Sequence, residues 1–302
     1  MPFTAAEVPD QTGRCFIVTG ANTGIGFEVA KMLAARRARV LLACRDKDKA
    51  EAAKARIRQE YAYANVAFLP LDQADLQSVR HAAERVADEP RIDVLVNNAG
   101  VMFPPLTRTR DGFELQFGVN HLGTFALTAL LLPKLAQTPG SRVVVTSSLA
   151  HQRGNLQWDD LNAENGYNRT ARYSDSKLAN MLHFAELDRR LRAAGSPVAA
   201  VGCHPGVAAT ELMRHVGPFR VFTPLFGLFL NSAAQGAWPA LEAATSPDVE
   251  PGGYYGPQGI GGMKGRSGPA KRTAQARDPD LARRLWDLSV EMTGIDPGLA
   301  PA

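Results

Sequence analysis

Short apolar segments alternate with longer helical segments through the first two-thirds of this sequence, and this alternation constrains the fold more than any other feature. The short segments are apolar at successive positions, as in CFIVT, RVLLAC and RVVVT. Strands of this kind are typical of a parallel sheet that helices cover on both faces. The pattern therefore predicts one doubly wound, Rossmann-like α/β domain over residues 1–302, with ligands bound at the carboxyl ends of its strands.

The alternation also gives expected boundaries for the individual elements. Strands are predicted at residues 15–19, 39–44, 66–71, 92–96, 142–146 and 198–201. Helices are predicted at residues 27–37, 46–60, 76–87 and near 122–135. Residues 252–302 are expected to form a glycine-rich loop, over 252–268, and a last helix capped by Asp278-Pro279 and followed by Gly294. The buried stripe of this helix is predicted to be Leu281, Leu285, Leu288 and Met292.

Composition is that of an ordinary globular protein, with 45% hydrophobic and 21% charged residues. A net charge of +4 spread over 302 residues, without a basic block, argues against nucleic-acid binding. The chain has only three cysteines, and their wide spacing predicts neither disulfides nor a zinc site. No acidic or histidine cluster has metal-ligand spacing, so no metal site is predicted.

The cysteine usage and the N-terminus point to the cytoplasm. Reduced, buried thiols suit a reducing compartment, and the polar start of the chain does not resemble a signal peptide. The longest strongly apolar run, residues 221–230, is too short to span a bilayer. A cytoplasmic protein without a stable membrane span is therefore expected.

A glycine-rich turn, TGANTGIG, lies between the first predicted strand and the first predicted helix. Its glycines, Gly20, Gly24 and Gly26, allow a sharp turn and the close approach of a diphosphate to the helix N-terminus. The spacing G-x-x-x-G-x-G differs from the common dinucleotide-binding spacing G-x-G-x-x-G. A purely structural turn is the alternative, but the position after the first strand favours nucleotide binding.

The residues that end the second strand bear on which dinucleotide is bound. An NAD site has a carboxylate there for the ribose hydroxyls, whereas this chain has Cys44 followed by Arg45. A guanidinium attracts a 2′-phosphate, so NADP(H) is predicted over NAD(H). The alternatives are that Arg45 is a solvated surface charge and that the neighbouring Asp46 serves an NAD ribose.

Tyr173 and Lys177 are four residues apart in YSDSK, which places them on one face of a predicted helix. A nearby ammonium favours the phenolate and brings the tyrosine pKa closer to neutral pH. That is suitable chemistry for taking a proton from an alcohol or giving one to a carbonyl. The spacing alone is common on ordinary helices. Further polar groups nevertheless fall at strand ends or on adjoining helices, namely Asn97-Asn98, Asn120, Ser147-Ser148 and His204-Pro205.

Together these motifs resemble the short-chain dehydrogenase/reductase family over roughly residues 13–210. The motifs TGANTGIG, ACRD, VNHLGTF, SSLAH, YSDSKLAN and HPG are closest to the branch that contains retinol dehydrogenases and protochlorophyllide reductases. The resemblance implies hydride transfer at a nicotinamide, coupled to proton transfer through Tyr173. It also implies that Lys177 lowers the tyrosine pKa and binds the nicotinamide ribose. Ser148 would hold the substrate oxygen, and Asn120 would support a water in a proton relay.

The resemblance implies a cofactor site along the strand ends. The phosphates would contact Gly20, Asn22, Thr23, Gly24, Ile25 and Gly26. The adenosine half would contact Arg45, Asp72, Gln73, Asn98, Ala99 and Gly100. The nicotinamide end would contact Tyr173, Lys177, Pro205, Gly206, Val207 and Thr210. A homo-oligomer, either a dimer or a tetramer, is expected from the same resemblance.

Two segments are expected to shape the substrate pocket. Residues 152–171 form an extra stretch before Tyr173, and its Trp158 and Tyr167 are expected in a substrate wall. Residues 207–235 are predicted to form a lid, in which Phe219, Phe222, Phe226 and Phe229 would exclude water; a dimer contact and a membrane contact are the alternatives. His151 and His204 are interpreted as structural or substrate-lining residues, because Tyr173 already fills the acid/base role.

These features predict an NADP(H)-dependent oxidoreductase that interconverts a secondary or allylic alcohol and its ketone or aldehyde on a small apolar molecule. One alternative is a non-catalytic NADP(H)-binding regulator on the same fold. It is disfavoured because Asn120, Ser148, Tyr173 and Lys177 are all present. The other is a membrane-surface, lipid-handling protein that uses residues 217–230.

Overall fold

A single eight-stranded sheet with helices on both faces organises the computed structural model, which describes residues 3–207 and 231–301. The strand order is β3-β2-β1-β4-β5-β6-β7-β8, parallel except for the antiparallel last pair. The strands are β1 (Cys15–Thr19), β2 (Arg39–Cys44), β3 (Asn65–Pro70), β4 (Val94–Asn97), β5 (Arg142–Thr146), β6 (Ala199–Cys203), β7 (Tyr254–Pro257) and β8 (Ser267–Pro269). The predicted doubly wound, Rossmann-like fold is confirmed.

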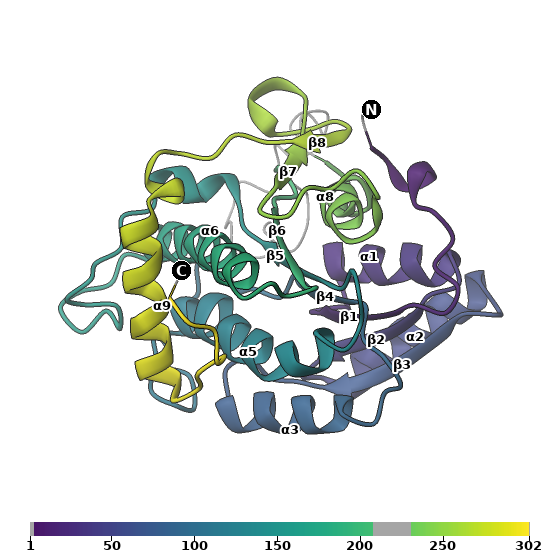
Figure 1. The fold of residues 1–302 in the computed structure, drawn as a ribbon, viewed down its shortest axis with the longest axis horizontal. Helices are drawn as coiled ribbons and strands as arrows, with labels where there is room; N and C mark the ends of the chain where they lie inside the picture. The colour runs from purple at the N-terminus through teal and green to yellow at the C-terminus, as the bar shows by residue number, and fades with distance from the viewer. Residues whose placement is uncertain (1–2, 208–230, 302) are drawn as a thin grey trace.

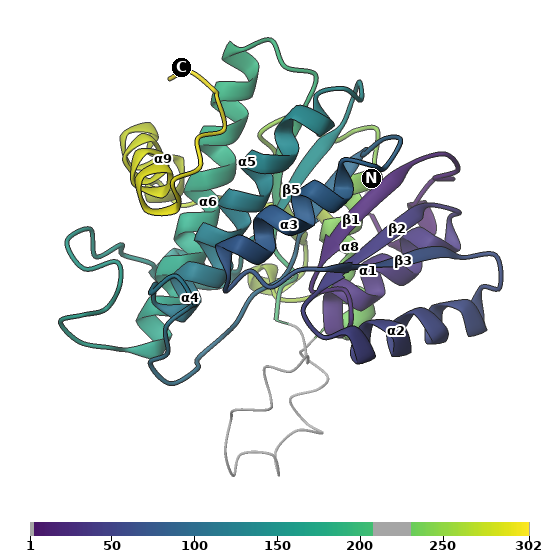
Figure 2. The same ribbon diagram turned by 90° about the horizontal axis from the view of Figure 1, so that it is seen from below.

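Helices cover the sheet in two layers (Figures 1 and 2). One face carries α1 (Gly24–Ala35), α2 (Lys47–Glu60) and α8 (Ala233–Thr245), and the other carries α3 (Leu76–Val86), α5 (Gly123–Leu135) and α6 (Arg169–Ala193). The strand side chains divide between the two layers, because successive residues of a strand point to opposite faces. In β1, Phe16 and Val18 join the α1 side, whereas Cys15 and Ile17 join the α5 side.

Sequence boundaries agree with the structure where capping and apolar runs were clear. The predicted strands 15–19, 39–44 and 142–146 match β1, β2 and β5. Helix α2 begins at Lys47 because Asp46 is its N-cap and accepts a hydrogen bond from the Lys49 N–H. Helix α1 begins at Gly24, earlier than predicted, since the glycine turn itself supplies the first helical turn.

The prediction that 252–268 is a loop was wrong in part. Residues Tyr254–Pro257 form β7, which extends the parallel sheet beside β6, and Ser267–Pro269 form the antiparallel edge strand β8. Glycines concealed these short strands, because they interrupt the apolar pattern that identifies a strand. One of them, Gly256, is required by packing: a Cβ there would lie 2.0 Å from His204 Nε2.

The last helix, α9 (Pro279–Thr293), starts and ends as predicted, with Asp278 as N-cap and Gly294 in the left-handed conformation at its end. Its buried residues are Ala282, Leu285, Trp286, Ser289 and Thr293, so Leu285 of the predicted stripe is confirmed, whereas Leu281, Leu288 and Met292 are only partly buried against the core. The large Trp286 ring determines the difference. It stacks on His183 of α6 at 6.1 Å between ring centroids and lies under the Arg190 guanidinium at 4.6 Å.

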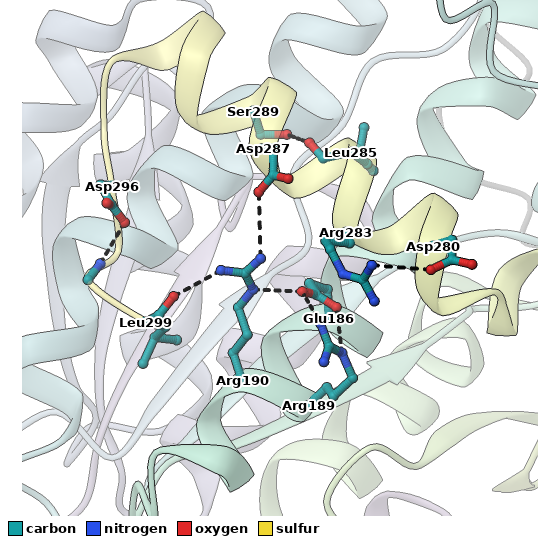
Figure 3. A network of polar contacts seen from close by, with 11 residues as sticks. Glu186, Arg189, Arg190, Asp280, Arg283, Leu285, Asp287, Ser289, Asp296 and Leu299 are labelled. Carbon is teal, nitrogen blue, oxygen red and sulfur yellow. Dashed lines mark hydrogen bonds and ion pairs between the residues drawn. The ribbon is translucent and has the colours of Figure 1, made fainter. Parts of the chain in front are cut away.

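An ion pair anchors α9 to α6, and a hydrogen bond anchors the C-terminal segment to the same helix (Figure 3). Glu186, whose side chain is fully buried, accepts hydrogen bonds from Arg189 and Arg190 at 2.6 Å each. Arg190 also donates to the Leu299 carbonyl at 2.9 Å and faces Asp287 at 3.6 Å. One buried carboxylate therefore holds a guanidinium that connects three parts of the chain.

Helix α5 continues a longer helical stretch that starts with α4 (Leu115–Phe117) and passes through a π-turn, Gly118–Leu122. Among the described helices, this Leu115–Leu135 stretch alone is long and apolar enough to cross a bilayer, by length and composition only. The predicted helix near 122–135 covers only the second part of this stretch, because polar residues interrupt the apolar pattern before it. In the structure 89% of its most apolar window is buried, as in the core helix of a globular domain.

Candidate functional site

The predicted site residues gather where four adjacent strands end. Register pairs Val18 of β1 with Val96 of β4, Asn97 of β4 with Val145 of β5, and Thr146 of β5 with Cys203 of β6, so these four strands end near one level. Between β1 and β4 the chain order reverses, and this is the point where ligands bind in a doubly wound sheet. The site therefore lies where the fold class predicts it.

The glycine turn after β1 is shaped to admit a diphosphate. Gly20 and Gly24 have left-handed φ values of +66° and +58°, which only glycine adopts without strain. A Cβ on Gly26 would lie 2.4 Å from the Gly20 carbonyl oxygen and 2.5 Å from Asn98 Nδ2. Thr23, the N-cap residue of α1, gives no side-chain capping bond, so first-turn N–H groups stay available to an anion. These residues fit the pyrophosphate of a dinucleotide.

The segment after β4 packs directly against this turn through Thr19. The Thr19 hydroxyl accepts hydrogen bonds from the N–H groups of Asn98 (3.0 Å) and Ala99 (2.9 Å). Asn98 Nδ2 donates to the Thr19 carbonyl at 2.9 Å. Thr19 thus fixes the Asn98–Gly100 segment, a role that was not predicted from the sequence. A hydroxyl at the last position of an otherwise apolar strand was the signal.

Arg45 and Asp46 follow β2 at the edge of this site. The Arg45 side chain is exposed. The Asp46 carboxylate, by contrast, is engaged in its own helix, with a hydrogen bond from the Lys49 N–H at 3.0 Å and an ion pair with Lys49 Nζ at 2.9 Å. The bond from the Lys49 N–H is the main reason why the pKa of Asp46 lies below its ordinary value.

Asp72 and Gln73, after β3, differ in their surroundings. Asp72 is half-buried and accepts a hydrogen bond from the Ala74 N–H at 2.9 Å. The Gln73 side chain is buried and donates to Thr124 Oγ1 at 3.0 Å. Its amide therefore connects the β3–α3 loop to α5, and a contact of Gln73 with the cofactor stays a prediction.

Helix α6 brings Tyr173 and Lys177 together with Ser148. Ser148 is the polar side chain beside the Tyr173 hydroxyl, and Lys177 Nζ lies 5.8 Å from the centroid of the Tyr173 ring. Lys177 Nζ also donates to the Thr146 carbonyl at 3.3 Å, at the end of β5. The predicted pairing of a phenol, an ammonium and a hydroxyl is present at the strand ends.

Burial is the main influence on the pKa values of Tyr173 and Lys177 in the protein without bound cofactor. It raises the pKa of Tyr173, and the hydrogen bond to Ser148 opposes the rise. Burial also lowers the pKa of Lys177 to about 8. The Lys177 ammonium is not among the causes of the Tyr173 shift, so its effect on the tyrosine pKa stays a prediction.

Asn120 lies inside the π-turn, with its side chain completely buried. Its amide accepts from the Val101 N–H at 2.7 Å and donates to the Val101 carbonyl and to Ser176 Oγ, each at 2.9 Å. A Cβ on Gly100 would lie 3.1 Å from Asn120 Oδ1 and 3.4 Å from Lys177 Nζ, so both groups border the same point. π-turns inside helices occur frequently at functional sites.

The segment after β6 reaches the opposite side of the site. Gly206 has φ +72°, and a Cβ there would lie 2.3 Å from the Met263 carbonyl oxygen. That carbonyl accepts a hydrogen bond from the Val207 N–H at 2.9 Å, and the Pro205 carbonyl accepts one from Asn231 Nδ2 at 3.0 Å. Thr210 and most of the predicted lid, including all four of its phenylalanines, lie outside the described residues.

Of the two aromatic residues expected in a substrate wall, the structure places only Tyr167 near Tyr173. Tyr167 donates to the Pro104 carbonyl at 2.9 Å, in a segment whose Phe103 ring meets Tyr173. Trp158 instead lies against Arg284 of α9, at 4.4 Å from guanidinium carbon to ring centroid. Cys15, Cys44 and Cys203 are buried free thiols, as predicted.

His151 and His204 pack below the Ser148 turn. His151 Nδ1 donates to the Ser148 carbonyl at 2.6 Å, and the Gly206 N–H donates to His204 Nδ1 at 3.2 Å. Both rings lie near the Tyr254 ring, at 5.8 Å for His151 and 5.4 Å for His204 between centroids. Burial lowers the pKa of both imidazoles, to about 4 for His204, so both stay neutral at physiological pH. These contacts agree with structural roles.

Fold and site together define a Rossmann-like α/β enzyme whose reactive groups lie at the carboxyl edge of the sheet. The chain belongs to the short-chain dehydrogenase family, whose family model, described as short chain dehydrogenase, matches residues 14–220. It is an oxidoreductase of the retinol dehydrogenase-like kind. Retinol dehydrogenase 13 of Homo sapiens is 45% identical over 293 residues, and retinol dehydrogenase 11 of Homo sapiens is 43% identical over 286; each match covers 94% of this chain and 86% of the relative.

Solved structures agree with this assignment. An uncharacterized protein from Mycobacterium paratuberculosis is 41% identical, with a TM-score of 0.83, covering 99% of this chain and 100% of that one. An RhlG–NADP complex from Pseudomonas aeruginosa has a TM-score of 0.65 at 23% identity and covers 80% of this chain and 94% of that one. The second likeness is one of fold alone.

Asp175, inside the YSDSK motif, makes folding stability depend on pH. Burial raises the pKa of its carboxyl to about 6, although the Asn155 N–H donates to it at 2.8 Å. Because this value exceeds the ordinary 3.8, the folded protein holds the proton more tightly than the unfolded chain does. The stabilising contribution is therefore complete below about pH 4 and is lost as the pH rises to about 6.

Replacing Asp175 with Asn should remove this dependence. Above pH 6 the variant is expected to be more stable than the parent protein by up to ~3 kcal/mol, because the amide oxygen still accepts from Asn155 and carries no buried charge. Urea unfolding at about pH 4.5 and pH 7.5 measures the difference. A stability difference that is the same at both pH values would contradict the assignment.

Proposed function

We propose that the protein is an NADP(H)-dependent oxidoreductase that interconverts an alcohol and its ketone or aldehyde on an apolar molecule, with Tyr173 as the acid/base. The observation that carries this proposal is the position of Tyr173 beside Ser148 and Lys177, at the carboxyl ends of the strands where the glycine turn also lies. The names of the retinol dehydrogenases, at up to 45% identity, support an apolar alcohol as the substrate class.

Each residue of the group has a distinct part in the proposed reaction. When bound, the nicotinamide supplies or accepts the hydride. Ser148 holds the substrate oxygen beside the Tyr173 hydroxyl, which gives the proton to a carbonyl or takes it from an alcohol. Lys177 returns a proton to Tyr173 after carbonyl reduction and accepts one from it after alcohol oxidation, and its pKa of about 8 suits both directions near neutral pH. Asn120 keeps the backbone at Val101 fixed beside Lys177.

The preference for NADP(H) rests on Arg45 and Asp46. Arg45 is exposed at the carboxyl end of β2, where the 2′-phosphate lies in a dinucleotide site of this fold. Asp46, the alternative partner for an NAD ribose, already caps α2 and pairs with Lys49. A guanidinium binds a phosphate with charge-assisted hydrogen bonds, so NADPH gains an interaction that NADH lacks.

Replacing Arg45 with Ala should raise the NADPH dissociation constant by about 10- to 100-fold and change that of NADH by less than about 3-fold. Fluorescence titration of the protein with each cofactor measures both values. Lys54→Ala is the matched control, since Lys54 is a cation on α2 that pairs with Glu51. Equal weakening of both cofactors by Arg45→Ala would mean that Arg45 does not recognise the phosphate.

We also propose a cytoplasmic homo-oligomer, for which buried free cysteines and the resemblance to the family are the supports. No observation favours the non-catalytic regulator, since the described site retains all four predicted catalytic residues.

A panel of retinoid, steroidal and simple carbonyl compounds, followed by nicotinamide absorbance with both cofactors, tests the proposed reaction. Absence of turnover across the panel with either cofactor would oppose it.

A further inference from the structure

We propose that Phe103 is a specificity-determining wall of the substrate site and that Gln116 is the positioning residue that holds it. This inference rests on the proposed function, since it assigns Phe103 to the substrate side of Tyr173. Neither residue belongs to the motifs that identified the site. Phe103 lies in the segment that follows β4, and Gln116 lies in α4.

The Phe103 ring stands edge-on to the ring of the proposed acid/base. Their centroids are 5.3 Å apart and the ring planes meet at 76°, a favourable aromatic geometry. Phe103 is half-buried, so part of its surface remains accessible. A substrate whose oxygen reaches Tyr173 and Ser148 must therefore place the groups on its carbonyl carbon close to this ring.

The backbone of Phe103 is strained, which implies that the surroundings impose its position. Its φ is +58°, in the left-handed region that side chains other than glycine rarely adopt. The next residue is Pro104, and a proline favours an extended conformation in the residue before it. The local sequence thus opposes the observed conformation twice, and strain of this kind persists only where neighbours enforce it.

Gln116 is the neighbour that enforces it. Its side chain is fully buried, and its Oε1 accepts from the Phe103 N–H at 3.0 Å. Its Nε2 donates to the Arg169 carbonyl at 2.9 Å and to the Tyr167 hydroxyl at 3.1 Å. Two backbone partners, a donor and an acceptor, fix which end of the amide faces Phe103.

Tyr167 closes the arrangement by donating to the Pro104 carbonyl at 2.9 Å. Gln116 thereby holds the peptide group before Phe103, and Tyr167 holds the peptide group after Pro104. Because Tyr167 belongs to the stretch before α6, the same bonds tie the wall to the helix that carries Tyr173. The substrate class that fits is a carbonyl compound or alcohol with a flat, bulky apolar group, which packs on an aromatic ring better than a short chain does.

The test measures kcat/KM for retinal and for butanal with NADPH and compares their ratio. Phe103→Ala should lower the retinal-to-butanal ratio by about 10- to 100-fold, with most of the loss in KM for retinal. Phe103→Gly removes the ring and also relieves the left-handed strain, so it should lower the ratio equally while melting above Phe103→Ala. Phe103→Tyr should keep the ratio within about 3-fold of the parent.

The positioning role of Gln116 is tested by a double variant. Gln116→Met should also lower the retinal-to-butanal ratio, because the Phe103 ring remains but is no longer held in position. If Gln116 acts through Phe103, the ratio of Phe103→Ala/Gln116→Met should equal that of Phe103→Ala alone. Additive losses would overturn the positioning role. Leu106→Ala, which alters an exposed side chain of the same segment, is the matched control and should keep the ratio within about 2-fold.

Two outcomes separate this inference from the proposed function. If Tyr173→Phe is inactive on both aldehydes and Phe103→Ala leaves their ratio unchanged, the wall is overturned while the reaction stands. If Tyr173→Phe keeps its activity on both aldehydes, the proposed function itself fails.

Discussion

Replacing Tyr173 with Phe should reduce turnover by ~10²- to 10⁴-fold or more while NADPH binding changes by less than about 3-fold. The substitution removes only the hydroxyl that contacts Ser148, and the ring keeps its edge-on contact with Phe103. The proton transfer then has no positioned donor or acceptor. Nicotinamide absorbance measures turnover, and quenching of protein fluorescence measures cofactor binding.

Ser148→Ala is the matched comparison for Tyr173→Phe. It removes the hydroxyl that opposes the rise of the tyrosine pKa. Activity should therefore fall, and the alkaline limb of the pH–rate profile should shift to higher pH. Normal turnover by Tyr173→Phe would exclude the acid/base role. Loss of both turnover and cofactor binding would instead indicate that the hydroxyl is needed for the fold of the site.

Replacing Glu186 with Ala should reduce the free energy of unfolding by ~3–5 kcal/mol, the range measured when one partner of a buried ion pair is removed. The reason is the geometry in Figure 3, where Glu186 is the buried carboxylate that faces Arg190. The Arg190 side chain is only 4% exposed, so its charge would lose its main counterion without gaining water. Urea unfolding followed by circular dichroism at neutral pH measures the loss.

Arg189→Ala provides the control, because Arg189 pairs with the same carboxylate from a more exposed position. Its loss is expected to be within about 1 kcal/mol. A Glu186→Ala variant as stable as Arg189→Ala would show that the buried pair does not hold α9 against α6.

The sequence predicted most of the parallel sheet because its strands are buried on both faces. A strand such as CFIVT, bounded by a glycine turn, has few other interpretations, and its limits match β1. The helices with capping residues were also accurate, as Asp46 and Asp278 show. Local signals were sufficient wherever the conformation depended on neighbours in sequence.

Prediction was weakest where distant residues determine the structure. The short strand β7 forms because β6 lies beside it, and its glycines hide it from a periodic pattern. The face of α9 depends on where Trp286 finds His183 and Arg190. The chemistry was predictable from residue type and spacing, but the wall beside Tyr173 was not. The side-chain amide of Gln116 holds the Phe103 backbone through a hydrogen bond that no sequence motif indicates.

The π-turn at Asn120 has a consequence for how this enzyme family could vary in length. A helix from 115 to 135 made regular by deleting one residue of the turn would regain ordinary i to i−4 bonding throughout. The same deletion would rotate the Asn120 amide by roughly 100° about the helix axis, away from the backbone of Val101 that it now holds at both ends. A fully regular helix would therefore lose the hydrogen bonds between Asn120 and Val101 beside Lys177. An insertion or deletion that keeps the site intact must leave the π-turn unchanged.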